Sequence, residues 1–240
     1  MINFPKDQSP KNRIERIEHD KKELKKRDEF QMNILNDMKH NYEIPVVQKL
    51  PLDVYPIAQK CSKYSKLPYG LISTVQNAGC GPLAVEYALR LIGFQIDFVS
   101  VLNECVIKGY RGYIRDEEDK IIDGLGTKYS LFSNIATELT NLEDILSFLQ
   151  KGVPITILIQ NSVYHNDEKR KGNHFITLVG VDKEKNAILM DGYRIETEND
   201  LSNALVRKTF EEMLLGLRGA WAWESEKVKI YLKWDRSLFF

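Results

Sequence analysis

The sequence predicts an α+β fold, in which helices come first along the chain and the strands of an antiparallel sheet follow. Two observations support this prediction. Apolar residues recur at helical spacing in several segments before residue 152, whereas the segments after it are short, rich in β-branched residues and bounded by polar turns. Because helices and strands do not alternate, a doubly wound parallel sheet is not expected.

The most distinct helical pattern begins at Cys80 and ends at Gly93. Pro82 suits the first turn, the glycine suits the end, and the apolar residues lie at i, i+3, i+4, i+7 and i+8: Ala84, Tyr87, Ala88, Leu91 and Ile92. Similar spacing predicts a second helix that places Cys105 in the core, and a third helix within residues 141–152.

The second half of the chain carries the strand pattern. Three short, β-branched segments predict strands: residues 153–160, 174–181 and 187–193. Residues 228–234 alternate between apolar and polar side chains, which predicts a half-buried strand near the end of the chain. Thr209 and Glu212 have the spacing of a capping box, so a helix is expected between these strands.

The first 43 residues differ in composition from the remainder. Lysine, arginine, glutamate and aspartate are dense between residues 9 and 42, and neither glycine nor proline occurs there after Pro10, which predicts a long helix. We therefore expect a charged helical arm, residues 1–43, and a main domain, residues 44–240. The arm either packs by one edge on the main domain or binds a partner protein.

The overall composition excludes several functional classes. The 34 basic residues balance the 34 acidic ones, so no global positive charge favours nucleic acid. The sequence shows no apolar signal segment, and no window reaches the roughly 18 apolar residues of a membrane span. The 3 cysteines are widely spaced and odd in number, which suits neither a disulfide framework nor a zinc site. We expect a cytoplasmic protein that binds neither nucleic acid nor membranes and requires no metal or cofactor.

Cys80 occupies an unusual position for a packing residue. It lies between Gly79 and Gly81, in the first turn of the predicted helix. The helix dipole and unpaired backbone N–H groups of a first turn favour a thiolate, and the two glycines leave room for a substrate backbone. Cys80 is therefore a candidate nucleophile, and the alternative is a buried structural cysteine.

His174 is the candidate base for this nucleophile. The chain has 4 histidines, of which His19 and His40 lie in the charged N-terminal segment and His165 lies in a predicted polar loop. His174 alone begins a strand, although an edge histidine with a structural hydrogen bond is the alternative. Asp191 follows on the next predicted strand and could orient the imidazole. A hairpin turn centred one residue differently would move one side chain to the other face, so Asp182 is a second candidate.

The ordered set of these residues resembles a known family. A glutamine shortly before a CGP motif at a helix start, the segment NLEDILSFLQKGVPITILI and the segment GNHFITLVGVDKEKNAILMDGY resemble the C39-type branch of the papain-like cysteine peptidases. The resemblance covers about residues 70–195. It implies a papain-like α+β fold, in which the nucleophile at a helix start packs on an antiparallel sheet.

The resemblance also implies a role for each of four residues. Cys80 would be the nucleophile, His174 the base and later the acid, and Asp191 the carboxylate that orients the imidazole. Gln76 would donate a hydrogen bond to the oxyanion, together with the backbone N–H of Cys80. Two features depart from the family pattern: only Asn77, Ala78 and Gly79 separate Gln76 from Cys80, where five residues are usual, and Gly192 rather than proline follows Asp191.

The function that the resemblance implies is cleavage of an amide bond. We expect a cysteine peptidase, or a related thiol amide hydrolase, that acts on a peptide or protein through a thioester acyl-enzyme. One alternative is an acyltransferase of the transglutaminase type, in which an amine rather than water resolves the thioester. Another is an inactive peptide-binding module of the same fold.

Overall fold

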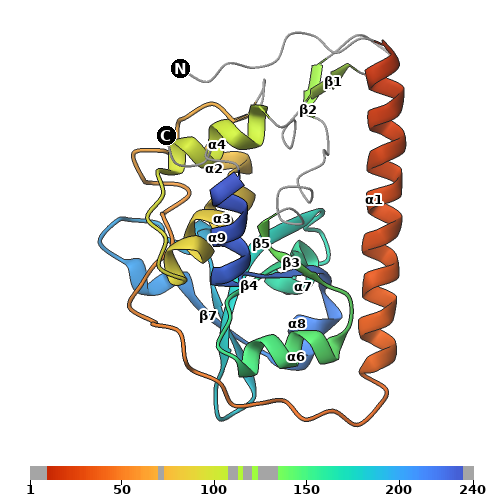
Figure 1. Cartoon of the computed structure of the whole chain (residues 1–240), viewed down its shortest axis with the longest axis vertical. Helices are drawn as coiled ribbons and strands as arrows, with labels where there is room; N and C mark the ends of the chain where they lie inside the picture. Colours follow the sequence, from red (N-terminus) through yellow and green to blue (C-terminus); the bar gives the residue numbers. More distant parts are fainter. Residues whose placement is uncertain (1–9, 70–72, 108–112, 116–120, 124–134, 235–240) are drawn as a thin grey trace.

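The computed structural model describes residues 10–69, 73–107, 113–115, 121–123 and 135–234 (Figure 1). Within these residues, helices surround an antiparallel sheet of six strands, ordered β3-β8-β4-β5-β6-β7. A separate hairpin pairs β1 with β2. The predicted α+β class with an antiparallel sheet is therefore confirmed.

The strands of the main sheet come from the second half of the chain. In sequence order they are β3 (Thr137–Leu139), β4 (Ile155–Gln160), β5 (Asn173–Val181), β6 (Asn186–Met190), β7 (Leu205–Thr209) and β8 (Leu217–Ala222). The small hairpin consists of β1 (Tyr113–Arg115) and β2 (Ile121–Asp123). The predicted strands at 153–160 and 174–181 are confirmed, and the third is shorter than predicted because the chain turns into a 3-10 helix after Asp191.

The described helices are α1 (Pro10–Asp37), α2 (Val75–Ala78), α3 (Cys80–Leu91), α4 (Phe98–Ile107), α6 (Leu142–Gln150), α7 (Asn161–His165), α8 (Phe210–Leu215) and α9 (Ser225–Trp234), with 3-10 helices η1 (Gly192–Arg194) and η2 (Leu201–Ala204). Helices α1, α3, α4, α6 and α8 begin close to the residues that the sequence predicts. The Thr209 hydroxyl accepts a hydrogen bond from the Glu212 N–H at 3.2 Å, which confirms the predicted cap of α8.

One predicted strand is wrong. Residues 228–234, predicted as a strand, belong to helix α9. The alternation of four apolar residues also contains helical spacing, since Val228, Tyr231 and Leu232 lie at i, i+3 and i+4. Glu226 in the first turn pairs with Lys229 one turn later at 2.6 Å, an interaction that helices favour.

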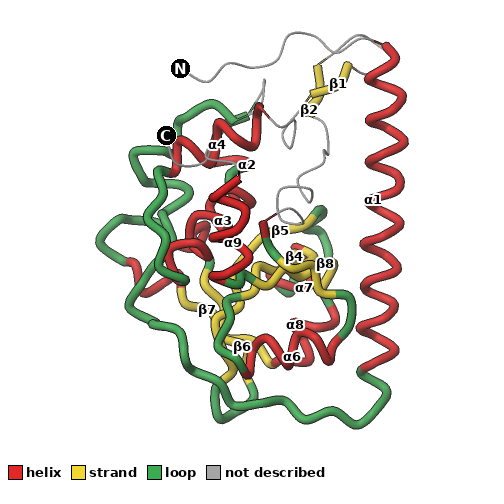
Figure 2. The backbone as a smooth tube through the Cα atoms, in the orientation of Figure 1, coloured by secondary structure: helices red, strands yellow, loops and turns green. Residues whose placement is uncertain are grey.

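The sheet separates two apolar clusters, and alternate residues of its strands face each side. Leu158 and Phe175 pack against α3, α4 and α9 in the first cluster. Ile157 and Ile176 pack against α1, α6 and α8 in the second cluster. Figure 2 shows the strands in yellow between these two groups of helices. Because both faces are covered, the central strands are apolar on both sides.

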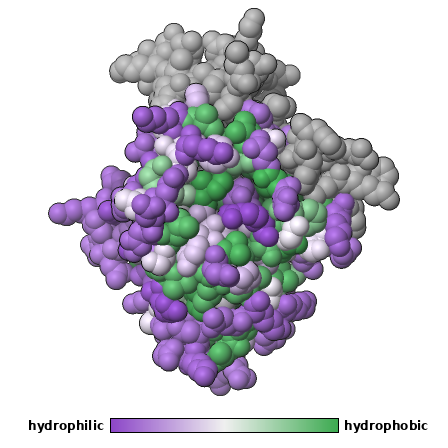
Figure 3. Space-filling model, turned by 90° about the vertical axis from the view of Figure 1, so that its left-hand side faces the viewer, coloured by the Kyte–Doolittle hydropathy of each residue, from purple (hydrophilic) through white to green (hydrophobic). Residues whose placement is uncertain are grey.

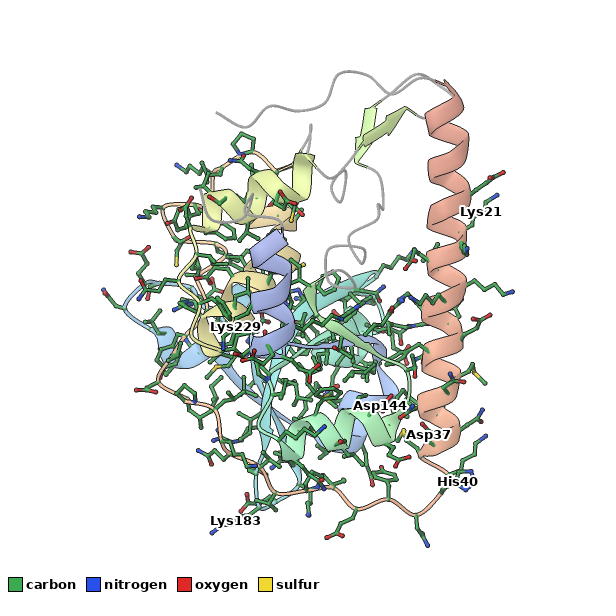
Figure 4. All side chains as sticks on the ribbon, in the orientation of Figure 1. Lys21, Asp37, His40, Asp144, Lys183 and Lys229 are labelled. Atoms are coloured by element: carbon green, nitrogen blue, oxygen red, sulfur yellow. The ribbon has the colours of Figure 1, made fainter. Side chains whose placement is uncertain are left out.

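Helix α1 runs along one side of the molecule, and its second half joins the core (Figure 1). Phe30 and Ile34 are buried in the second cluster, and Arg27 is only 3% exposed. At its end, the Asp37 carboxylate accepts a hydrogen bond from the Leu142 N–H at the start of α6, at 2.9 Å (Figure 4). The long helix is thus confirmed, while the division into an arm and a main domain stays a prediction.

The segment after α1 wraps around the bottom of the molecule before it reaches α2 (Figure 1). Its half-buried apolar residues pack on a third cluster beneath α3: Leu50, Leu52, Val54, Tyr55 and Cys61. On the face in Figure 3, hydrophobic residues gather in the middle and hydrophilic ones surround them. Among the described residues, no helix is both long enough and apolar enough to cross a membrane.

Candidate active site

Cys80 is the first residue of α3, and Gly79 alone separates it from α2. A Cβ atom at Gly79 would lie 2.6 Å from the Val75 carbonyl oxygen, so only glycine permits this close junction of two helices. A Cβ atom at Gly81 would make ordinary contact with the Phe175 ring at 3.6 Å. The Cys80 side chain is half-buried, whereas Cys105 lies in the core as predicted.

His174 lies near the start of β5 and is 7% exposed. Its Nε2 atom is 2.8 Å from Asp191 Oδ1. The same imidazole is hydrogen-bonded to the Cys80 side chain. Since Nε2 faces the carboxylate, Nδ1 is the ring nitrogen left for the thiol. The three side chains therefore form a continuous line from sulfur to imidazole to carboxylate.

Asp191 is 2% exposed and receives hydrogen bonds at both carboxylate oxygens. Oδ1 lies 2.8 Å from His174 Nε2 and accepts from the Tyr193 backbone N–H at 2.9 Å. Oδ2 accepts from the Tyr164 hydroxyl at 2.8 Å. A buried carboxylate with donors at both oxygens is held in one orientation and favoured in its ionised form.

The electrostatics of this group favour a charged imidazole. Burial by itself would lower the pKa of His174, but the charge and hydrogen bond of Asp191, and also Cys80, raise it well above its ordinary value. Burial alone would raise the pKa of Asp191, yet the His174 charge and the hydrogen bonds that Asp191 accepts hold it below its ordinary value. An imidazolium beside Cys80 in turn favours the thiolate.

The β5–β6 hairpin decides which aspartate meets His174. Thr177 pairs with Met190, and the register shifts between Leu178 and Gly180, so that Asp191 emerges from β6 near the start of β5. Asp182 lies at the opposite end of the hairpin, where its Oδ1 accepts from the Asn186 N–H at 2.8 Å. Asp191, the first choice from the sequence, is thus the aspartate beside His174.

Comparison with known families identifies the family of this chain. A model described as the Peptidase_C39 like family matches residues 51–219. The chain belongs to the Peptidase_C39 like family. A comparison with curated proteins finds no match. The helix start at Cys80, packed on an antiparallel sheet, is consistent with the papain-like fold of this C39-like family.

The predicted oxyanion residue of this C39-like chain is exposed, whereas the other three are buried or half-buried. Gln76 is an exposed residue of α2 and is not among the residues lining the cavity beside Cys80. A different glutamine, Gln59, lines that cavity together with Cys80 and Asp191 and is only 3% exposed. Its Nε2 donates to the Gln76 backbone carbonyl at 3.1 Å. The role of the Gln76 side chain stays a prediction, and Gln59 is a competing residue that the sequence reasoning missed.

The sequence reasoning also missed Tyr164. Residues 161–172 read as a polar loop, whereas the structure folds Asn161–His165 into α7 and buries Tyr164. Its signal in the sequence is a lone large aromatic residue in the otherwise mostly polar segment NSVYHND. Gln59 had an equally faint signal, because no motif marks it in the segment YPIAQKCS.

Other parts of the described chain offer no comparable chemistry. No group of three or more histidine, cysteine or carboxylate residues that could hold a metal ion occurs among the described residues. The larger groove between the end of α1 and α6 is lined by Asp37, His40 and Glu143 with their neighbours and contains none of the predicted site residues.

Proposed function

We propose that the chain is a cysteine peptidase, or a related thiol amide hydrolase, with Cys80, His174 and Asp191 as its catalytic triad. The observation that carries this proposal is the buried imidazole of His174, which is hydrogen-bonded to Asp191 on one side and to Cys80 on the other. A nucleophile, a base and an orienting group in line are the arrangement that nucleophilic catalysis needs. The proposed substrate is a peptide or protein.

The first half of the reaction cleaves the amide bond. The Cys80 thiolate attacks the carbonyl carbon, and the carbonyl oxygen becomes an oxyanion. The His174 imidazolium then donates its proton to the leaving nitrogen, the C–N bond breaks, and a thioester on Cys80 remains. Asp191 stabilises the imidazolium throughout and keeps the Nδ1–H of His174 directed at the reacting atoms.

The second half of the reaction releases the product. Neutral His174 takes a proton from water, and the resulting hydroxide equivalent attacks the thioester carbon. When the new tetrahedral intermediate collapses, the carboxylic acid product leaves and Cys80 returns as the thiolate beside the imidazolium. If an amine attacked in place of water, the same residues would catalyse acyl transfer.

We propose Gln59 as the side-chain donor to the oxyanion, with the Cys80 backbone N–H as the second donor. Gln59 is buried at the cavity beside Cys80, and its bond to the Gln76 carbonyl uses one of its two amide hydrogens. The other amide hydrogen is available for the substrate oxygen. Gln76 supplies a backbone carbonyl in this arrangement, so it positions the Gln59 amide.

Alkylation of the cysteines tests the nucleophile. Cys61 is a matched control, because it is also half-buried and free, but burial and nearby Glu198 raise its pKa. With iodoacetamide at about pH 6, well below the ordinary thiol pKa of about 8.5, Cys80 should react at least ~10-fold faster than Cys61. His174→Ala should remove the difference. Equal labelling of the two cysteines in the wild-type protein would contradict the proposal.

Turnover assays then test the oxyanion donor. Gln59→Ala should lower kcat/KM by about 100-fold while Cys80 alkylation stays fast, because an oxyanion donor acts only on the tetrahedral intermediate. Gln76→Ala is the matched control and should retain its turnover, since its backbone carbonyl remains. The reverse ranking would return the role to Gln76.

Product analysis distinguishes the remaining functions. Mass spectrometry of products formed with an added amine separates hydrolysis from acyl transfer. Rapid Cys80 labelling without turnover of any member of a broad peptide library would favour a peptide-binding module.

A further inference from the structure

Tyr164 contacts the proposed triad from outside it. It belongs to α7, which follows β4 directly, and β4 pairs with β5 so that Ile159 lies opposite His174. The Tyr164 side chain is 5% exposed, and its hydroxyl donates to Asp191 Oδ2 at 2.8 Å. The other carboxylate oxygen is already used by His174 and by the Tyr193 N–H.

The Tyr164 ring also packs on the imidazole. Its centroid lies 5.7 Å from that of His174, with the planes tilted by 39°. On another side it meets the His165 ring edge-on, at 4.8 Å between centroids. Tyr164 therefore covers both the carboxylate and the imidazole and separates them from the second apolar cluster, to which it belongs.

We propose that Tyr164 is a positioning residue, whose hydroxyl keeps Asp191 ionised and fixed so that Oδ1 stays on His174 Nε2. This inference rests on the proposed function, because the position of Asp191 matters only if His174 serves Cys80. Tyr164 touches neither the sulfur nor the substrate in this role and acts through Asp191 alone.

The physical reason is the cost of an unpaired carboxylate oxygen in the interior. Without the Tyr164 hydroxyl, Oδ2 would lose its described donor while Asp191 remained 2% exposed. An unsatisfied buried charge favours protonation, and a protonated Asp191 no longer stabilises the imidazolium. Burial and the Asp191 charge raise the pKa of Tyr164, so the phenol remains a proton donor at every working pH.

Charged and titratable groups from four elements or loops surround the His174–Asp191 pair. The groups with described interactions are Cys80 on α3, Tyr164 and His165 on α7, Arg170 in the loop after α7, and Tyr193 and Arg194 on η1. Burial, followed by the charges of Arg170 and His174, lowers the pKa of His165. His165 is thus less readily protonated than an ordinary histidine. In acid the Cys80 thiolate takes up a proton, and Asp191 opposes this by stabilising the imidazolium beside the sulfur.

The test compares Tyr164→Phe with Tyr42→Phe. The phenylalanine keeps the packing of Tyr164 and removes only its hydroxyl. Tyr42 packs on the same apolar cluster and makes no described contact with Asp191, so it is a matched control. The first measurement is the rate of Cys80 alkylation against pH, and the second is kcat and KM for a cleaved peptide.

We expect Tyr164→Phe to move the acid midpoint of Cys80 alkylation upward by ~0.5–1 pH unit. It should lower kcat about 10-fold and leave KM unchanged, because the hydroxyl does not contact substrate. Tyr42→Phe should match the wild type. In an Asp191→Asn background, Tyr164→Phe should cause no further shift, whereas a merely structural role would add its effect in both backgrounds.

Two outcomes would overturn the inference, and they are distinguishable. If wild-type Cys80 labels rapidly and Tyr164→Phe has the same acid midpoint, Tyr164 does not position Asp191 and the proposed function stands. If wild-type Cys80 labels as slowly as Cys61, the proposed function fails and the inference fails with it. If Tyr164→Phe loses its folded circular dichroism, 3-fluorotyrosine at position 164 takes the place of that variant. The analogue should then shift the acid midpoint of Cys80 alkylation. No shift with that analogue would equally overturn the inference.

Discussion

The Arg27–Glu138 pair joins a buried cation to a half-buried carboxylate, whereas both partners of the His174–Asp191 pair are buried. Arg27 on α1 is 3% exposed, contacts Glu138 on β3 and lies over the Trp221 ring at 5.2 Å. His174 contacts Asp191 at 2.8 Å, and its imidazole is also hydrogen-bonded to the Cys80 side chain. The first pair joins a helix to the sheet, and the second pair joins a thiol to a carboxylate.

The difference lies in the cation and in its other neighbour. Arginine remains protonated at any ordinary pH, so the Arg27 pair cannot exchange a proton. It only holds helix α1 against strand β3. Histidine can lose its charge, and the thiol beside His174 can exchange a proton with the imidazole. Burial and charge pairing alone therefore do not indicate a catalytic site, whereas a titratable cation next to a nucleophile supports the proposed one.

The largest effect should come from Asp191→Asn. Without the carboxylate, the imidazolium loses its stabilising charge, and turnover should fall on the order of 10³–10⁴-fold. The free energy of unfolding should change little, because His174 can become neutral. Turnover with a peptide substrate and urea denaturation measure the two quantities. Asp182→Asn is the matched control, and a greater loss of turnover there would mean that the wrong aspartate was chosen.

The corresponding change in the other pair is Glu138→Gln. Arg27 cannot become neutral, and the variant leaves it with the more distant Glu23 carboxylate at 3.7 Å, so the free energy of unfolding should fall by about 1–3 kcal/mol. Turnover per folded molecule should be unchanged. Replacing both partners, with Arg27→Met and Glu138→Leu, should restore most of the stability. If the double variant were as unstable as the single one, the comparison between the two pairs would be wrong.

The pH dependence of stability provides a smaller effect. Burial alone would raise the pKa of Glu138, but hydrogen bonds from Lys26 and Arg27 outweigh it, so the folded-state pKa lies below that of the unfolded chain. Such a group stabilises the fold above about pH 4.3, the ordinary value, and the contribution is lost as pH falls through the lower folded-state pKa. The stability gap between wild type and Glu138→Gln should therefore narrow in acid, and a constant gap down to pH 3 would contradict this account.

The smallest effect should come from Lys26→Met. The Lys26 side chain is 47% exposed and reaches the second oxygen of Glu138. Exposed ion pairs contribute about 0–1 kcal/mol, so urea denaturation should detect only a slight loss. A loss as large as that of Glu138→Gln would show that Lys26, and not the buried Arg27, is the main partner of the carboxylate.

Local patterns predicted much of the fold. The helix at Cys80 was predictable because its apolar spacing, its proline and its glycine all agree. Strand β8 was not, since Arg218 and Gly219 interrupt any apolar alternation in LRGAWA. Helix α9 was mistaken for a strand because seven residues are too few to separate the two periods.

Local sequence patterns identify only part of the candidate site. Cys80 and His174 are identified by their own positions at the starts of a helix and a strand. Asp191 required the hairpin register, which a bulge within β5 alters. No local sequence pattern identifies Gln59 or Tyr164. Only the packing of the segment between α1 and α2, and of helix α7, brings these residues to the site.

The strand order has a consequence for how the chain is made. β8 is the last described strand along the sequence but lies inside the sheet, between β3 and β4. A growing chain therefore exposes one edge of β4 until residues 217–222 have left the ribosome. The β4 sequence ITILIQ is apolar and β-branched, a composition that promotes pairing with foreign strands. Nascent chains that stop before residue 217 should accordingly aggregate or remain bound to chaperones.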